Sequence, residues 1–165
     1  MSVFVLLKFT FIGQGNYQIQ RLRSSLNPQD ASLQVRIANQ KKLAGYLKTH
    51  FLGGGVGSGG YWGQRFSPNT FLANLALDSW YVRIAAEYGY AGLLYYIFML
   101  LFILYKALQK LRNEMDPLLK KQGIALFCGL SGIIVASYSN QVLGQMPTGI
   151  LVYLSIVFLT QNEQY

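Results

Sequence analysis

The sequence is poor in the residues that build disulfides and metal centres. It has one cysteine, Cys128, and one histidine, His50, among 165 residues. A single cysteine excludes a disulfide within the chain, and a histidine without a second nitrogen or sulfur ligand nearby does not make a zinc site. No catalytic-triad pattern is present either. We therefore expect no metal and no cofactor, and an ordinary packing role for Cys128.

Charge is also scarce, at 12% of the residues, and most of it is positive, with a net charge of +8. Hydrophobic residues make up 52% of the chain. They gather in blocks at 91–108, 123–142 and 148–160, and the positive charge falls between the blocks. This composition is typical of a membrane protein rather than a soluble domain. Membrane lipids are the expected surroundings, and no nucleic-acid partner is expected.

Three segments are predicted to cross the membrane as helices. Residues 88–108 carry no charge before Lys106, and about 20 such residues at ~1.5 Å each cross a ~30 Å hydrocarbon layer. Residues 123–142 form a weaker span with small residues suited to close packing. Residues 147–160 are short, with Pro147 at the first helical position.

The first residues, 1–14, look like the last part of a further membrane helix. Lys8 interrupts their apolar run, and no small-residue cleavage site of a signal peptide follows. We therefore expect the chain to begin inside a longer protein whose preceding helices it needs as partners. Whether Met1 is a natural start stays open.

Charge between the spans predicts which side of the membrane each loop occupies. Residues 106–122 carry five basic side chains against two acidic ones, which is typical of a short cytoplasmic loop. Residues 15–87 carry eight basic and three acidic side chains, yet one helix separates the two loops. Long loops translocate largely regardless of charge, so we expect 15–87 to be extracytoplasmic and 88–165 to hold the membrane helices. A cytoplasmic long loop is the alternative.

A helix is predicted at 28–51 within the long loop, with Asn27 as N-cap, Pro28 first and Asp30 in the first turn. At 100° per residue its apolar side chains form one stripe, which consists of Leu33, Ile37, Leu43, Ala44, Leu47 and Phe51.

Two polar side chains, Arg36 and Gln40, interrupt that stripe. A guanidinium on an apolar face needs a partner, because an unpaired buried charge is costly. Either Arg36 reaches solvent or pairs with Asp78 or Glu87, or it contacts an anionic substrate.

The stretch LGGGVGSGGYWG at 52–63 contains the spacing G-x-G-x-x-G of a dinucleotide fingerprint, and Asp78 follows at a suitable distance. The context does not fit, since a helix rather than a strand is predicted before it and Tyr61-Trp62-Gly63 is not expected to start a helix. Two interpretations remain: a flexible linker, or a tight path where backbone approaches another element or an anionic ligand. Nearby Tyr61, Trp62 and Arg65 suit a sugar or a membrane interface and favour the second.

The segment before the first long span holds ordinary features. Asp78 or Ser79 can serve as the N-cap of the helix that follows. Arg83 and Glu87 stand four residues apart, a spacing typical of a surface ion pair.

Taken together, Asp30-x-Ser32-x-x-x-Arg36, the turn FLGGGVGSGG and the segment DSWYVRIAAEYGYAGLL resemble the C-terminal part of the O-antigen ligase and O-antigen polymerase family. The resemblance covers residues 27–108. It implies an all-α, polytopic glycosyltransferase of the bacterial inner membrane with a large periplasmic loop, acting on oligosaccharides linked to undecaprenyl pyrophosphate. Asp78-Ser79 stands where many ligase-like members have His-Asn, which favours repeat-unit polymerisation over ligation.

The resemblance also implies a mechanism without metal. A sugar hydroxyl of one lipid-linked oligosaccharide attacks another, and the anionic leaving group requires electrostatic stabilisation. Arg36, which matches the family's arginine in this helix, would hold the pyrophosphate. Asp78 is either a base for the hydroxyl or a helix cap. Further substrate contacts would come from Gln40, Lys48, Arg65 and Arg83. The rival hypotheses are a non-enzymatic transporter or anion-binding membrane protein, and a chain inactive without its missing helices.

Overall fold

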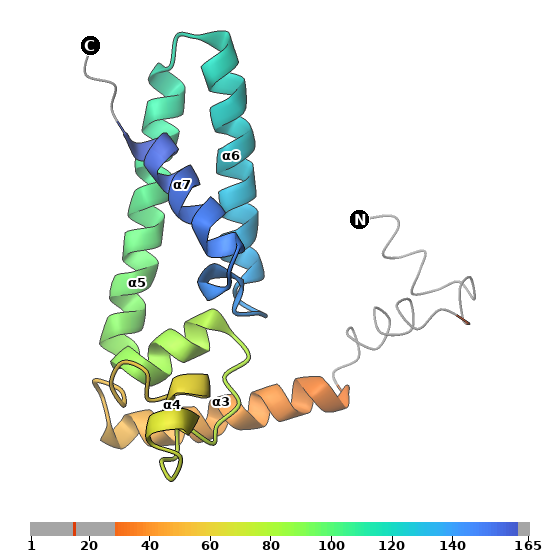
Figure 1. The fold of residues 1–165 in the computed structure, drawn as a ribbon, viewed down its shortest axis with the longest axis vertical. Helices are drawn as coiled ribbons and strands as arrows, with labels where there is room; N and C mark the ends of the chain where they lie inside the picture. Colours follow the sequence, from red (N-terminus) through yellow and green to blue (C-terminus); the bar gives the residue numbers. More distant parts are fainter. Residues whose placement is uncertain (1–14, 16–28, 162–165) are drawn as a thin grey trace. The chain divides into compact units, whose positions relative to one another are not determined.

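The computed structural model describes residue 15 and residues 29–161, and within them every regular element is helical. The elements are α3 (Ala31–Thr49), α4 (Gly60–Phe66), α5 (Trp80–Asn113), α6 (Pro117–Ala136), the 3₁₀ turn η1 (Val142–Gly144) and α7 (Thr148–Thr160), labelled in Figure 1 where space allows. The expected all-α class is confirmed for these residues. They divide into two units, one ending at Lys42 and one from Leu43 onward, and each is described by itself. The helix expected at 1–14 lies outside the described residues.

Helix α3 begins later than the sequence predicts, because Asp30 is its cap rather than part of its first turn. The Asp30 Oδ1 atom accepts hydrogen bonds from the backbone amides of Ser32 at 2.9 Å and Leu33 at 3.2 Å. A capping carboxylate satisfies amides that have no partner within the helix. Asn27 and Pro28, the expected start, lie outside the described residues.

Only part of the predicted apolar stripe is buried, namely Leu43 and Leu47 in the second half of α3, whereas Ile37 in the first half is exposed. Leu43 and Leu47 are only 4% and 2% exposed, and they pack in a core with Leu72, Ala85 and Ala86. Phe51, which was expected to continue the stripe, lies beyond the end of the helix at Thr49 and is 62% exposed. The buried part of the stripe therefore anchors the end of α3 to the start of α5. It does not extend to residue 51.

Helices α5 and α6 form a hairpin whose connection is much shorter than the loop predicted at 106–122. Helix α5 continues to Asn113 and α6 starts at Pro117. The Asp116 Oδ1 atom accepts the amide of Leu118 at 2.7 Å, and proline is favoured at the first helical position. The predicted span at 123–142 is likewise shifted, because this cap starts the helix early and α6 ends at Ala136.

Helix α7 lies across the hairpin and packs against both of its helices (Figure 1). Pro147 is the residue just before this helix rather than its first residue. The buried side chains that join the three helices are Ala107, Leu111, Leu130, Leu143, Val152 and Leu159.

Among the described helices, α5 and α6 are long and apolar enough to cross a membrane. Only 11% of the most apolar window of each is buried, so these are not helices enclosed in a core. Helix α7 is apolar but, at 13 residues, spans only about 20 Å at ~1.5 Å per residue. Cys128, expected to be packed, is exposed on α6.

Candidate functional site

The central feature of the second unit is a break in α5 at Gly89. Its φ of 71° and ψ of −172° lie outside the helical region, so a short helix before it meets a longer apolar one after it. This combination of angles is essentially restricted to glycine. The break leaves backbone carbonyls in the preceding turn that need donors from elsewhere.

The glycine-rich segment supplies those donors. The amide of Gly54 donates to the carbonyl of Ala86, and the amide of Gly55 donates to the carbonyl of Glu87, each at 2.9 Å. Gly53 and Gly55 have φ of 80° and 93°, which side-chain-bearing residues rarely adopt. The segment is therefore clamped onto the broken turn of α5. We call these two hydrogen bonds the glycine clamp.

The fit of this segment leaves no space for side chains at two of its glycines. A Cβ on Gly53 would lie 2.5 Å from the Gly89 nitrogen, and a Cβ on Gly63 would lie 2.2 Å from the Ser58 carbonyl oxygen. Of the two interpretations drawn from the sequence, close approach of backbone to another element is confirmed and a flexible linker is wrong.

The dinucleotide fingerprint has no nucleotide fold around it in the described residues. The element before the glycines is α3, a helix, and no strand occurs in the part of the chain that the structure describes. One argument from the sequence was nevertheless wrong, because Tyr61, Trp62 and Gly63 do lie in a helix, α4. A seven-residue helix was hard to predict because its sequence, GYWGQRF, contains two glycines and little helical periodicity.

Helix α4 exposes an aromatic surface around one arginine. Trp62 packs edge-on against Tyr61 at 5.2 Å between ring centroids and stacks with Phe66 at 5.9 Å. Arg65 donates from Nη1 to the Tyr61 hydroxyl at 3.2 Å and lies 5.7 Å from the Phe66 ring centroid. The three rings are between 48% and 72% exposed. We call these four residues the α4 surface.

The Arg83–Glu87 pair lies in the turn that the clamp holds, and it is more buried than the predicted surface pair. The Arg83 Nε donates to Glu87 Oε1 at 3.0 Å, with side chains 23% and 7% exposed. Arg83 Nη1 also donates to Gln141 Oε1 at 3.4 Å, and Gln141 Nε2 donates to the Leu77 carbonyl. A buried carboxylate needs such partners, so this pair joins α5 to the segment after α6.

The beginning of α5 is fixed by α6 rather than by its own N-cap side chain. Ser79 is the N-cap residue, but its side chain makes no capping bond, and its Oγ donates to the Ser137 carbonyl at 3.4 Å. The Trp80 amide donates to the same carbonyl at 3.2 Å. Trp80 Nε1 donates to the Tyr96 hydroxyl at 2.9 Å. The start of α5 is therefore held by the end of α6.

The six residues proposed from the sequence are divided between the two units. Arg36, half-buried, and exposed Gln40 belong to the first unit. The other four belong to the second unit: Lys48, Arg65, Asp78 and Arg83. Lys48 and Asp78 are exposed, and Asp78 precedes the N-cap Ser79.

Sequence reasoning missed the residues that build the clamped turn. Gly89 entered the sequence analysis only within the segment DSWYVRIAAEYGYAGLL, and its role as the break depends on the glycines at 53–55. Gln141 follows α6 and carries no recognisable signal. The spacing of Arg83 and Glu87 did signal an ion pair, but not its burial.

In residues 29–161 no three His, Cys, Asp or Glu side chains are grouped as metal ligands. Comparison with known proteins adds no relative: no family model, curated protein or solved structure matches this chain.

Proposed function

We propose that this chain is the C-terminal portion of a membrane glycosyltransferase that polymerises oligosaccharide repeat units carried on undecaprenyl pyrophosphate, with ligation of such units as the related alternative. The proposed location is the bacterial inner membrane, with the loop at 15–87 on the periplasmic side and the α5–α6 turn in the cytoplasm.

Membrane insertion is supported by the apolar side chains that α5 and α7 leave uncovered. Leu94, Phe98 and Leu101 on α5 are 60–68% exposed, and Leu151 and Leu154 on α7 are 60% and 62% exposed. A helix that is hydrophobic around its circumference belongs in lipid or in a large core. Further helices of a longer chain would cover part of this surface.

The observation that carries the proposal is the α4 surface, held beside the start of the apolar helix by the glycine clamp. The clamp binds the segment before α4 to Ala86 and Glu87, just before the uncharged run of α5 begins. Aromatic rings offer flat apolar faces to sugars and favour the membrane interface, and Arg65 adds a bidentate donor for phosphate. A glycan attached to a pyrophosphate in the membrane presents these two chemistries together.

In the proposed reaction, a hydroxyl oxygen of the acceptor sugar bonds to the anomeric carbon of the donor. The bond from that carbon to the pyrophosphate oxygen breaks, and the hydroxyl proton passes to a base, for which Asp78 is the proposed residue. Arg36 would stabilise the departing pyrophosphate, because its planar guanidinium binds two oxygens at once. Lys48 and Arg65, both exposed, would add positive charge, and Gln40 would add an amide. Arg83 contributes less, since Glu87 already neutralises it.

The proposal is tested by expressing the complete gene in cells that display the polysaccharide and comparing chain-length ladders. Arg36→Ala and Arg65→Ala should shorten or abolish the ladder, and Arg36→Lys should restore little of it, because an ammonium cannot bind bidentately. Arg112→Ala is the matched control, since Arg112 is exposed at the far end of α5.

Unchanged ladders for both Arg36 variants at normal protein levels would refute the proposed role of Arg36. Loss of uptake of an anionic solute, with normal glycans, would instead identify the chain as part of a transporter. For Asp78, polymerisation retained in Asp78→Asn would exclude a base at this position.

A further inference from the structure

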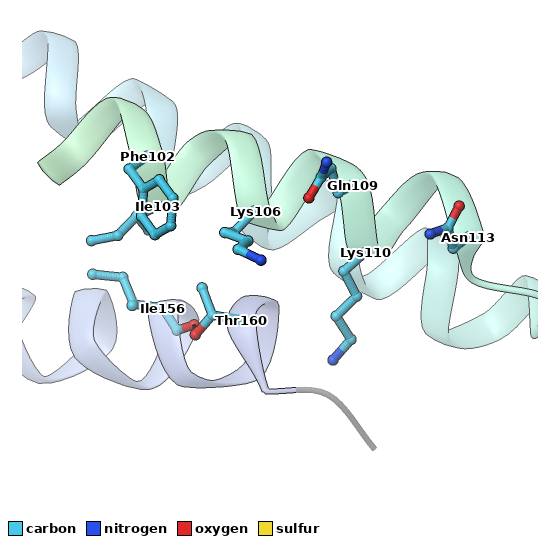
Figure 2. Close-up of a pocket in the computed structure, with 8 residues that line it drawn as sticks. All are labelled: Phe102, Ile103, Lys106, Gln109, Lys110, Asn113, Ile156 and Thr160. Atoms are coloured by element: carbon cyan, nitrogen blue, oxygen red, sulfur yellow. Dashed lines mark hydrogen bonds between the residues drawn. The ribbon is translucent and has the colours of Figure 1, made fainter. Parts of the chain in front are cut away.

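A cavity of about 500 Å³ lies between α5 and α7, at the opposite end of α5 from the glycine clamp (Figure 2). Its lining is divided by chemistry. Phe102, Ile103 and Ile156 form an apolar part. Five polar residues form the rest of the lining that the structure describes, and none of these five is acidic: Lys106, Gln109, Lys110, Asn113 and Thr160.

The side chain of Lys110, which lines the polar part, is held in place by hydrogen bonds. Its Nζ donates to the backbone carbonyls of Phe158 and Gln161, each at 2.8 Å, and lies 5.2 Å from the Phe158 ring centroid. Phe158 lies in the last turn of α7 and Gln161 is its C-cap, and a positive charge is favoured at this end of a helix. Lys110 therefore joins α5 to the end of α7 and holds a positive charge at the cavity edge.

Lys106 provides a second positive charge one helical turn before Lys110, on the same face of α5. Its Nζ lies 6.0 Å from the Phe102 ring centroid, so its stem runs beside the apolar part while its ammonium meets the polar part (Figure 2). Gln109 and Asn113 bring side-chain amides to the same lining, and Gln109 Nε2 donates one of its two hydrogens to the Tyr105 hydroxyl at 2.6 Å. Among the residues that the structure describes, this lining holds two ammonium groups and no carboxylate, so it favours an anion.

The position of the cavity along α5 further limits which class of anion can occupy it. Lys106 is the first charged residue after Glu87, so the cavity spans the boundary between the uncharged run and the basic end of the helix. A free phosphate or a soluble anion would use the polar part alone. An occupant that uses the whole lining has an anionic head and an apolar tail.

We propose that this cavity binds an anionic phospholipid, with the headgroup phosphate between Lys106 and the amides and the start of an acyl chain against Phe102 and Ile156. Basic pockets between membrane helices on the cytoplasmic side are suited to such headgroups. The site depends on the proposed insertion of α5 in a membrane, and it is independent of glycosyl transfer.

The test uses the full chain in nanodiscs of mixed phosphatidylglycerol and phosphatidylcholine, with bound lipid measured by native mass spectrometry. Phosphatidylglycerol should be retained preferentially. Lys106→Gln should weaken its binding about fivefold, which corresponds to ~1 kcal/mol for one lysine at a membrane surface. Lys106→Arg should keep the binding, and Lys121→Gln, a change to an exposed lysine outside the cavity, should weaken the preference for phosphatidylglycerol clearly less than Lys106→Gln does.

Equal losses for Lys106→Gln and Lys121→Gln would overturn the site, because they would indicate diffuse attraction by the basic end of the hairpin. Equal retention of the two lipids would also overturn it. Displacement of the lipid by inorganic phosphate at equal concentration would identify a site for a free anion instead. None of these results bears on the glycan ladders that test the proposed function.

Discussion

Gly53 and Gly89, 36 positions apart in the sequence, lie so close that a Cβ on Gly53 would come within 2.5 Å of the Gly89 nitrogen. This contact fixes the path from α3 to α4 against the break in α5. Glycine is needed at both positions because a side chain would not fit there, and not because the chain must be flexible.

The first prediction concerns Gly89. Gly89→Ala should lower the free energy of unfolding by at least about 2 kcal/mol, because alanine is strained at a φ of 71° and its Cβ would lie 2.0 Å from the Phe51 carbonyl oxygen. Unfolding in detergent micelles, followed by far-ultraviolet circular dichroism, measures the change. Gly129→Ala is the control, since nothing lies within 4 Å of its Cβ position in α6. This variant should raise the free energy of unfolding by up to about 1 kcal/mol. Equal stability of the two variants would contradict the clamped geometry.

The second prediction concerns the Arg83–Glu87 pair. Arg83→Met should lower the free energy of unfolding by roughly 3 kcal/mol, because it leaves the buried carboxylate of Glu87 without its cation. The double variant Arg83→Met/Glu87→Leu should recover most of that loss, and Arg112→Met, at an exposed position, should cost less than about 0.5 kcal/mol. The same unfolding measurement gives the coupling energy of the pair. Additive single changes would mean that the two side chains do not depend on each other.

The third prediction concerns the hydrogen bond between Trp80 and Tyr96. Tyr96→Phe removes the acceptor of the Trp80 indole nitrogen and should cost about 1 kcal/mol. The neighbouring Tyr95 is 71% exposed, so Tyr95→Phe is a matched control with an expected change below about 0.5 kcal/mol. Thermal unfolding followed by tryptophan fluorescence compares the two. A larger loss for Tyr95→Phe would show that the hydroxyl of Tyr96 does not hold the start of α5.

The fourth prediction concerns the start of α6. Asp116→Ala should cost about 1 kcal/mol, because the Leu118 amide loses its capping acceptor, whereas Asp116→Asn should cost only a few tenths. Both variants are compared by unfolding in micelles. If alanine and asparagine behave alike, the cap contributes nothing and proline alone determines where α6 begins.

The sequence predicted helices correctly where one local signal determines the structure. The long apolar run ending at Lys106 predicted the second part of α5, and the segment after Pro147 predicted α7 almost to the residue. The start of α6 was missed although its signal was local, because the capping pair Asp116-Pro117 lies within a basic segment that was interpreted as a loop.

What the sequence could not predict depends on contacts between distant segments. The break at Gly89 needs the amides of Gly54 and Gly55. The Arg83 side chain that pairs with Glu87 also donates to Gln141, which follows α6. Hydrophobic periodicity predicts neither of these long-range contacts. The resemblance that suggested the proposed reaction rests on short stretches of sequence.

The glycine clamp has a consequence for how α5 can move. In an uninterrupted helix the carbonyls of Ala86 and Glu87 would accept the amides of Tyr90 and Ala91, four residues on. Gly54 and Gly55 now hold those carbonyls. If the glycine-rich segment moved away, these two carbonyls would lose their donors. A straighter helix could then supply the amides of Tyr90 and Ala91 in their place. Opening of the loop and straightening of the span would then be a single event.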